Sequence, residues 1–216
     1  IAAMNTTQVR AFTAAQIGAL DASDVAEFTE TQIGSLFTTQ VQAFNSTNFA
    51  ALADTQVAAL TAAQIQAVST TNVAAMTETQ MGALSTTLVA ALSTTQLKAL
   101  TTTNLSALDA TQVGALTTTQ IAGLNATQIS AFDTADFGEL STAQVAAMTA
   151  AQVAGLTETN IGDLADTQVA ALTATQVAAL NTTNVRALAD TQVATMTTTQ
   201  IAALTGTQIS ALQTTD

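Results

Sequence analysis

The sequence predicts an all-α solenoid, a superhelix of 27 very short helices with one helix in each octapeptide and about 3.4 octapeptides in each turn. Three observations lead to this prediction. An eight-residue unit repeats without insertion or deletion over all 216 residues. Each unit holds two large apolar residues spaced for one face of a helix. Most units also carry residues that start helices.

Two slots in every unit hold the large apolar residues. A spacing of three places both side chains on one face of a helix, whereas a strand would point them to opposite faces. One long helix is excluded because the alternating spacings of three and five average about 4.0 residues, so the apolar stripe would wind into water. The first slot runs from Ile1, Val9 and Ile17 to Ile209, and the second from Met4, Phe12 and Leu20 to Leu212.

A capping box follows the second apolar slot in most units. Thr, Ser, Asn or Asp stands there, and Gln usually comes three residues later, as in Ser93 and Gln96. In this arrangement each of the two side chains accepts a hydrogen bond from the backbone N–H of the other residue. Each unit therefore encodes a helix of one to two turns that ends where the next cap begins. Helices this short persist only by stacking on their neighbours.

The remaining positions predict which residues face the core and which face water. Ala usually precedes the second apolar residue, and we expect it at the contact between stacked turns. Arg10, Lys98 and Arg186 share the slot after the first apolar residue, which should face water. Phe37 stands in a cap slot and is expected to be an exposed contact. Six phenylalanines in apolar slots are expected in the core: Phe12, Phe28, Phe44, Phe49, Phe132 and Phe137.

The alternative fold is a Thr-rich β-solenoid. It suits the β-branched residues but leaves one apolar slot outside on every rung. For either fold, no boundary interrupts the register, so we expect one continuous solenoid over residues 1–216. Because the chain starts with Ile rather than Met, we expect it to be a fragment of a longer repetitive chain.

A slower period is marked at the Gln position. Leaving Leu88 aside, the exceptions fall in units 3, 6, 9, 13, 17, 20, 23 and 27, a mean step of about 3.4 units. A superhelix of that period would align them along one edge. We call this set the ladder, and it consists of Asp24, Asn48, Asn72, Asn104, Asp136, Asn160, Asn184 and Asp216.

Every carboxylate lies within six residues of the ladder, so the net charge of −12 should gather on one acidic edge. Three interpretations of this edge stay open. In the first, the edge is a sharper corner in each turn, where Asn and Asp cap helices. In the second, it is a calcium site built from oxygen ligands. In the third, it is a lateral contact with another copy or a partner. The candidate calcium ligands are Asp24, Glu27, Asp136, Glu139, Asp163 and Asp166.

The composition argues against several function classes. The chain has no His and no Cys, which removes the usual general base and the best nucleophile, so we expect no enzyme. An acidic chain is repelled by nucleic acid and by anionic membranes. No apolar run approaches the roughly 18 residues of a membrane span, and the start does not resemble a signal peptide. We expect no cofactor apart from the calcium considered above.

The octads resemble the long T-T-x-Q-[IV]-x-A-L arrays of very large bacterial surface or adhesin-like proteins, some of them described as haem-utilisation or adhesion proteins. Residues 173–180 and 197–204 carry the resemblance most clearly, and it extends over the whole chain through this short pattern. It implies a structural or adhesive role in the extracellular space or at the cell surface. It carries over no catalytic residue.

Together these observations predict a structural or interaction protein, a stiff extracellular spacer, stalk or filament-forming segment. About eight turns at about 9 Å each would extend over about 70 Å. The expected partners are other copies, joined end to end or laterally, or flanking domains of a longer chain. The alternatives are a module that binds a repeating surface such as ice, through triplets such as residues 101–103, and a surface protein stiffened by calcium.

Overall fold

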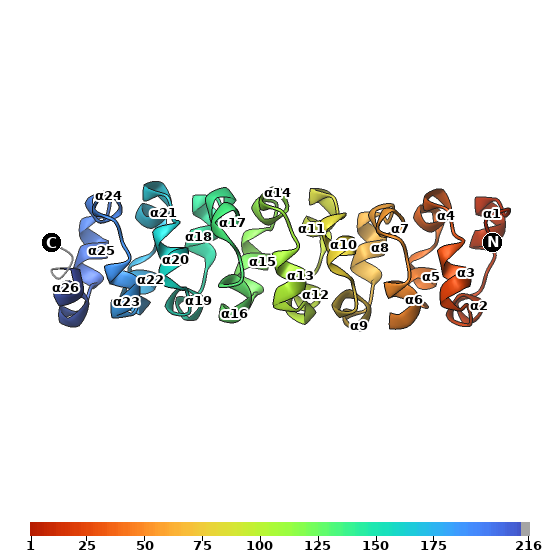
Figure 1. Cartoon of the computed structure of the whole chain (residues 1–216), viewed down its shortest axis with the longest axis horizontal. Coiled ribbons are helices and arrows are strands. Elements are labelled where there is room, and N and C mark those ends of the chain that lie inside the picture. The colour runs from red at the N-terminus through yellow and green to blue at the C-terminus, as the bar shows by residue number, and fades with distance from the viewer. Residues whose placement is uncertain (213–216) are drawn as a thin grey trace. The chain divides into compact units, whose positions relative to one another are not determined.

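Short helices make up the computed structural model, which describes residues 1–212 (Figure 1). In these residues 26 helices of four to seven residues follow one another, and no β-strand occurs. The prediction of an all-α fold is therefore confirmed, and the β-solenoid is excluded.

The helices belong to two compact units, Ile1–Leu108 and Asp109–Asp216. The continuous solenoid over residues 1–216 stays a prediction. Unit 1 contains α1 (Thr6–Arg10), α2 (Ala14–Gly18), α3 (Ala22–Ala26), α4 (Glu30–Ser35), α5 (Thr38–Val41), α6 (Ser46–Ala50), α7 (Asp54–Ala58), α8 (Ala62–Ala67), α9 (Thr70–Ala74), α10 (Glu78–Gly82), α11 (Thr86–Ala91), α12 (Thr94–Ala99) and α13 (Thr102–Ser106). Unit 2 contains α14 (Ala110–Gly114), α15 (Thr118–Gly123), α16 (Ala126–Ile129), α17 (Thr134–Glu139), α18 (Thr142–Ala147), α19 (Ala150–Ala154), α20 (Glu158–Gly162), α21 (Asp166–Ala171), α22 (Ala174–Ala179), α23 (Thr182–Arg186), α24 (Asp190–Ala194), α25 (Thr198–Ala203) and α26 (Gly206–Leu212).

The number of described helices is one fewer than the predicted 27. Each complete octapeptide, counted from one N-cap residue to the next, forms one helix, and residues 1–4 come before the first N-cap residue, Asn5. These four residues form a turn, closed by a hydrogen bond of 2.9 Å from the backbone N–H of Met4 to the carbonyl of Ile1. The last four residues of the chain lie outside the described part.

Most helices begin at the predicted capping box, whereas α6, α9, α11, α13 and α23, which have Asn or Leu as their third residue, lack the complete box. In α12 the hydroxyl of Ser93 accepts from the backbone N–H of Gln96 at 3.2 Å, and the side-chain oxygen of Gln96 accepts from the backbone N–H of Ser93 at 2.8 Å. The helix ends at Leu100, whose backbone turns to an extended conformation at ψ 142° and leads into the next cap. Two of the N–H groups that helix starts leave unpaired are thus satisfied locally.

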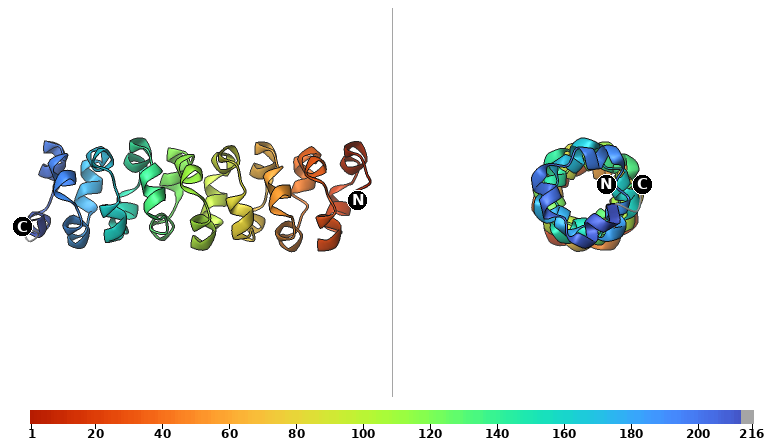
Figure 2. Two further views of the ribbon diagram at one scale, coloured as in Figure 1. Left: turned by 45° about the horizontal axis from the view of Figure 1, so that its top comes forward. Right: turned by 90° about the vertical axis from the view of Figure 1, so that its left-hand side faces the viewer.

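Each unit is a superhelix in which a helix packs on the helix three places further along the chain. In unit 1, α1 packs on α4, α4 on α7, α7 on α10 and α10 on α13; in unit 2, α14 packs on α17 and α17 on α20. Figure 2 shows the helices of residues 1–108, coloured red to yellow-green, passing repeatedly around one axis. We call one passage around the axis a winding. The hydrogen bonds that buried Gln and Asn side chains form between windings join residues 28 to 31 apart, so a winding holds between three and four octads, as predicted.

The two apolar slots form the core between the helices. In the middle of each unit the first-slot residues, such as Ile65 and Val145, are 0% exposed, and second-slot residues such as Leu100 are 3 to 5% exposed. Complete burial of a side chain of this size contributes about 1.5–3 kcal/mol, which explains why helices of one to two turns persist. Five of the six core phenylalanines are buried, and Phe12 is half-buried.

The slot after the first apolar residue faces outward, as predicted for Arg10, Lys98 and Arg186. In unit 1 the same slot also lies near the next winding. A Cβ atom added at Gly34 would lie 3.0 Å from the carbonyl oxygen of Ala59, so this glycine permits close packing of the two backbones. No helix of residues 1–212 is both long and apolar enough to traverse a lipid bilayer.

Candidate functional site: the buried side chains that join the windings

The third helical position, N3, is where consecutive windings are joined. In α12 the side-chain nitrogen of Gln96 donates to the carbonyl oxygens of Ile65 and Val68 at 2.7 and 2.8 Å. Its side-chain oxygen accepts from the backbone N–H of Ser93, and the residue is only 2% exposed. One amide group therefore caps its own helix and ties that helix to the previous winding.

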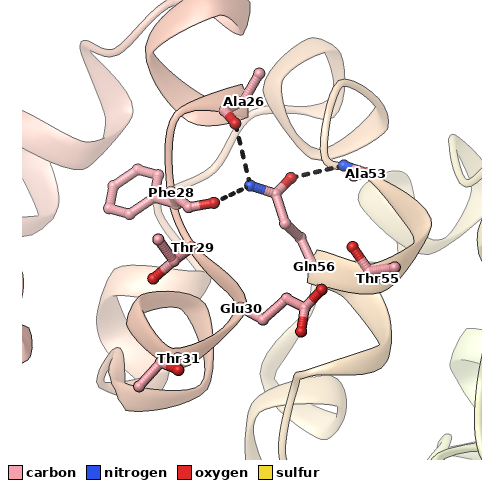
Figure 3. Close-up of a pocket in the computed structure, with 8 residues that line it drawn as sticks. All are labelled: Ala26, Phe28, Thr29, Glu30, Thr31, Ala53, Thr55 and Gln56. Atoms are coloured by element: carbon pink, nitrogen blue, oxygen red, sulfur yellow. Dashed lines mark hydrogen bonds between the residues drawn. The ribbon is translucent and has the colours of Figure 1, made fainter. Parts of the chain in front are cut away.

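Gln56 does the same in α7, as Figure 3 shows. Its oxygen accepts from the backbone N–H of Ala53 at 2.6 Å, and its nitrogen donates to the carbonyls of Ala26 and Phe28. Ala53 has no side-chain oxygen and so cannot cap the helix with its own side chain; Gln56 supplies the bond to the backbone N–H of Ala53, and the carboxylate of Asp54 accepts from the backbone N–H of Thr55 at 2.8 Å. Equivalent bonds, from a glutamine nitrogen to the carbonyl 28 residues earlier, are formed by Gln32, Gln40, Gln64, Gln80, Gln144, Gln152, Gln168, Gln176, Gln192, Gln200 and Gln208.

The chemistry of these bonds explains why N3 is Gln rather than Glu. Either side chain completes a capping box, but only the amide has N–H groups to donate at neutral pH. The carbonyl 28 residues earlier, such as that of Val68, lies just past the end of a helix in the previous winding, where no intrahelical partner exists. The carbonyl 31 residues earlier, such as that of Ile65, also accepts from the backbone N–H that ends its own helix. A buried carbonyl that loses its partner destabilises the fold by about 1–3 kcal/mol.

The capping role of Gln followed from the sequence, and its role between windings did not. The signal was nevertheless present. A capping box accepts Glu as readily as Gln, yet Glu never occupies N3 in this chain. An amide occupies this position in all repeats except those with Asp24, Leu88, Asp136 and Asp216, and this preference indicates a second partner that needs a donor.

The asparagines of the ladder occupy the same buried position with a shorter side chain. The nitrogen of Asn104 donates to the carbonyl of Met76 at 2.7 Å, but its oxygen accepts from the hydroxyl of Thr101 rather than from a backbone N–H. The bond to the carbonyl 28 residues earlier is also formed by Asn48, Asn72 and Asn184, whose helices lack the complete capping box. Asn160 forms both kinds of bond: its side-chain oxygen accepts from the backbone N–H of Thr157 at 3.1 Å, and its side-chain nitrogen donates to the carbonyl of Phe132 at 3.3 Å. The ladder asparagines thus lie between windings and not on the surface.

The structure places most of the ladder on helices that stack in sequence. In unit 1, α3, α6 and α9 pack in this order and hold Asp24, Asn48 and Asn72; α13, which holds Asn104, packs on α10 instead. In unit 2, α17, α20 and α23 pack in order and hold Asp136, Asn160 and Asn184. Asp216 lies outside the described residues.

Leu88 is the one apolar residue at N3 among the described helices. It is 3% exposed and has no group that accepts from the backbone N–H of Ser85. Within residues 1–212, neither this N–H nor the carbonyl of Leu60, 28 residues before Leu88, has a hydrogen-bond partner. The tie between α8 and α11 therefore rests on apolar packing alone at this position.

The candidate calcium ligands are placed on several helices. In unit 1, Asp24 is half-buried and exchanges hydrogen bonds with Asp21, and Glu27 accepts from the N-terminal ammonium group at 2.7 Å. In unit 2, Asp136 is buried and Glu139 is exposed. Asp163 accepts from the hydroxyl of Thr134 at 2.7 Å, and Asp166 is half-buried in the first turn of α21. Within residues 1–212 no three carboxylates form a group suited to hold a metal ion, so we assign none of them as a ligand.

Two carboxyl groups have shifted pKa values. The hydrogen bond from the backbone N–H of Asp24 lowers the pKa of the exposed Asp21. Burial raises the pKa of Asp136 to about 6; the hydrogen bond from the backbone of Asp133 opposes this shift, and the charges of Asp133 and Asp109 add to it.

Shallow cavities lie between the windings at two equivalent places in unit 1. One of about 390 Å³ is shown in Figure 3 and is lined by Thr29, Glu30, Thr55 and Gln56 among others; one of about 460 Å³ lies 48 residues further along, beside Glu78. No buried side-chain polar atom of the described residues lacks a hydrogen-bond partner. The cavities therefore offer hydroxyl groups and one carboxylate at an open surface, without a preformed set of unpaired donors or acceptors.

Phe37 is exposed as predicted, at 47%. It replaces the usual cap residue of α5 and provides no side-chain cap. The guanidinium group of Arg10 lies over its ring, 4.1 Å from the ring centroid, which is the geometry of a cation–π contact.

These observations define a class of protein, the α-solenoid repeat proteins, in which each short helix is stable only through its neighbours. The family comparison agrees with this class. The model of the ALTTAQ repeat matches residues 1–36, 89–126 and 129–166, which together are just over half of the chain. The chain belongs to the ALTTAQ repeat family. No curated protein matches it significantly.

Proposed function

We propose that this chain is a structural spacer, a stiff segment of a stalk or filament at the cell surface or in the extracellular space. The observation that supports the proposal is the bond from N3 to the previous winding. It is directional, because each winding offers donors toward the preceding winding and carbonyls toward the following one. Such an interface repeats without closing on itself, so the length of the array follows from the number of octads.

The distribution of polar groups also favours a structural role. The buried amide groups form their hydrogen bonds within the array. The exposed positions of the repeat hold mostly Thr and Ala, with scattered acidic residues. No catalytic residue is proposed, because the chain has no His or Cys and its carboxylates are spread over many helices. The expected partners are further repeats of the same kind, other copies of the chain and flanking domains.

The resemblance to large bacterial surface arrays supports a location outside the cell and an adhesive context. An array without cysteine and with few charges would be insensitive to redox conditions and to salt, which suits an exposed spacer.

The test is a length series. Seven octads, residues 125–180, are duplicated once and then twice, and the maximum dimension is measured by small-angle X-ray scattering. The spacer proposal predicts an increase of about 18 Å for each duplication, since each adds about two windings at about 9 Å. A matched control carries Gln→Glu at the N3 positions of the duplicated segment and should give a larger increase with the scattering profile of a flexible chain, because an unstacked segment is more extended than a folded one. A maximum dimension that does not grow with the duplications would contradict the proposal.

The location is tested separately by protease treatment of intact source cells, followed by mass spectrometry of the released peptides. Peptides of this chain should appear before those of intracellular proteins. Their appearance only after lysis would refute the proposed location without affecting the spacer proposal.

A further inference from the structure

Asp136 places a carboxyl group in a buried position that holds an amide in most helices. It is the N3 residue of α17 and is 4% exposed, which matches the burial of Asn160 and Gln144 at the same position of neighbouring helices. Its side-chain oxygen accepts from the backbone N–H of Asp133 at 2.9 Å, so the capping half of the N3 role is retained. Unlike an amide, a carboxyl group at this buried position carries a charge unless it is protonated.

The titratable groups on α17 and on the unit 2 helices that pack against it are all acidic. The helix of Asp136 carries Asp133 at the N-cap and Glu139 at the last position. The helices that pack on α17 are α14, with Asp109 at its N-cap, and α20, with Glu158 in its first turn and Asp163 at its C-cap. The sequence has no basic residue between Lys98 and Arg186. An ionised Asp136 is therefore buried without a counter-charge and close to the like charges of Asp133 and Asp109.

We propose that Asp136 makes the α17 winding of unit 2 sensitive to pH: the protonated carboxyl group holds α17 in its stacked position, and the ionised group loosens it. The ligand of this switch is the proton. The inference concerns one helix and does not depend on the spacer function proposed above.

The sign of the effect follows from linkage. The pKa of Asp136 is about 6 in the folded chain, above its ordinary value of 3.8. The folded state thus binds the proton more tightly than the unfolded state does. Stabilisation is complete below about pH 3.8 and is lost as pH rises through about 6. For these two pKa values, the equilibrium constant for opening α17 rises about tenfold between pH 5 and pH 8.

The test compares the whole chain with Asp136→Asn and Asp24→Asn at pH 5 and pH 8, in the presence of a chelator. Asn is the natural N3 residue at 160 and 184, so the first variant should fold, and Asp24 belongs to the same D-x-x-D pattern but is half-buried. Opening of residues 133–140 is followed by hydrogen exchange, corrected for the intrinsic pH dependence. The tenfold difference should be present in the unchanged chain and in Asp24→Asn and absent in Asp136→Asn. An equal pH dependence in all three chains would overturn the proposal.

A second measurement does not rely on variants. The carboxyl carbon of Asp136 is titrated by NMR in the unchanged chain. A midpoint near pH 6 is expected, and a midpoint below about pH 4.5 would overturn the proposal, because the two protonation states would then not exchange in the pH range considered.

Discussion

Replacing Gln96 by Glu separates the two functions of the N3 side chain. The carboxylate of the variant can still accept from the backbone N–H of Ser93, so the capping box survives. What is lost are the bonds to the carbonyls of Ile65 and Val68, both formed inside unit 1 at 2.7 and 2.8 Å. A site that is 2% exposed then brings an anion close to two carbonyl oxygens.

The expected loss of stability is about 2–4 kcal/mol at pH 7.5, from about 1 kcal/mol for each missing hydrogen bond and the cost of burying an unpaired charge. Protonation restores a donor, so the variant should recover part of this loss at pH 4.5. Gln96→Asn is the matched control, because Asn occupies N3 in the ladder and keeps one inter-winding bond; it should lose less than half as much.

The assay is urea unfolding followed by circular dichroism, with hydrogen exchange of residues 93–100 to locate the effect. If Gln96→Glu is as stable as the unchanged chain at pH 7.5, the inter-winding bond contributes nothing to stability. If Asn destabilises the chain as much as Glu does, the capping bond contributes as much to stability as the bonds between windings, contrary to the expected difference.

Three further predictions concern single positions and are measured by the same urea unfolding experiment. Leu88→Gln should stabilise the chain by about 1–2 kcal/mol, since the new amide can reach two backbone groups that have no partner now; no gain would mean that apolar packing compensates fully. Gly34→Ala should destabilise the chain because the added Cβ atom would lie 3.0 Å from a backbone oxygen. Gly138→Ala should stabilise the chain by about 1 kcal/mol, because the added Cβ atom would have no heavy atom within 4 Å and Ala favours a helix more than Gly does. Equal effects of the two substitutions would contradict the close packing of the windings at Gly34. Ala53→Thr should add about 1 kcal/mol through a new N-cap, and Thr61→Ala should remove a similar amount; a loss in the first variant would show that the cap geometry is wrong.

Much of the fold was accessible from the sequence because each octad is locally complete. The pair Ser93 and Gln96 specifies a helix start without reference to distant residues, and the apolar spacing of three excludes strands. The burial of Ile65 and Leu100, the exposure of Phe37 and a winding of between three and four octads followed from the same regularity. Local signals of this kind are reliable when they repeat and agree with one another.

The candidate site was less accessible because its partners are distant in the sequence. A hydrogen bond from Gln96 to a carbonyl 28 residues earlier leaves no local trace apart from the choice of Gln over Glu. The ladder was found from its spacing, but its burial was not, since Asn and Asp are usually exposed. For the same reason the sequence suggested a surface edge around Asp136, where the structure has a buried carboxyl group.

The most direct test of the account is an experimental structure of the whole chain at a resolution that places side-chain amides. The account predicts that the side-chain nitrogen of Gln96 lies about 2.8 Å from the carbonyl oxygen of Val68, with short helices on either side. A Gln96 side chain that points into solvent, with the windings joined by apolar contacts only, would contradict it.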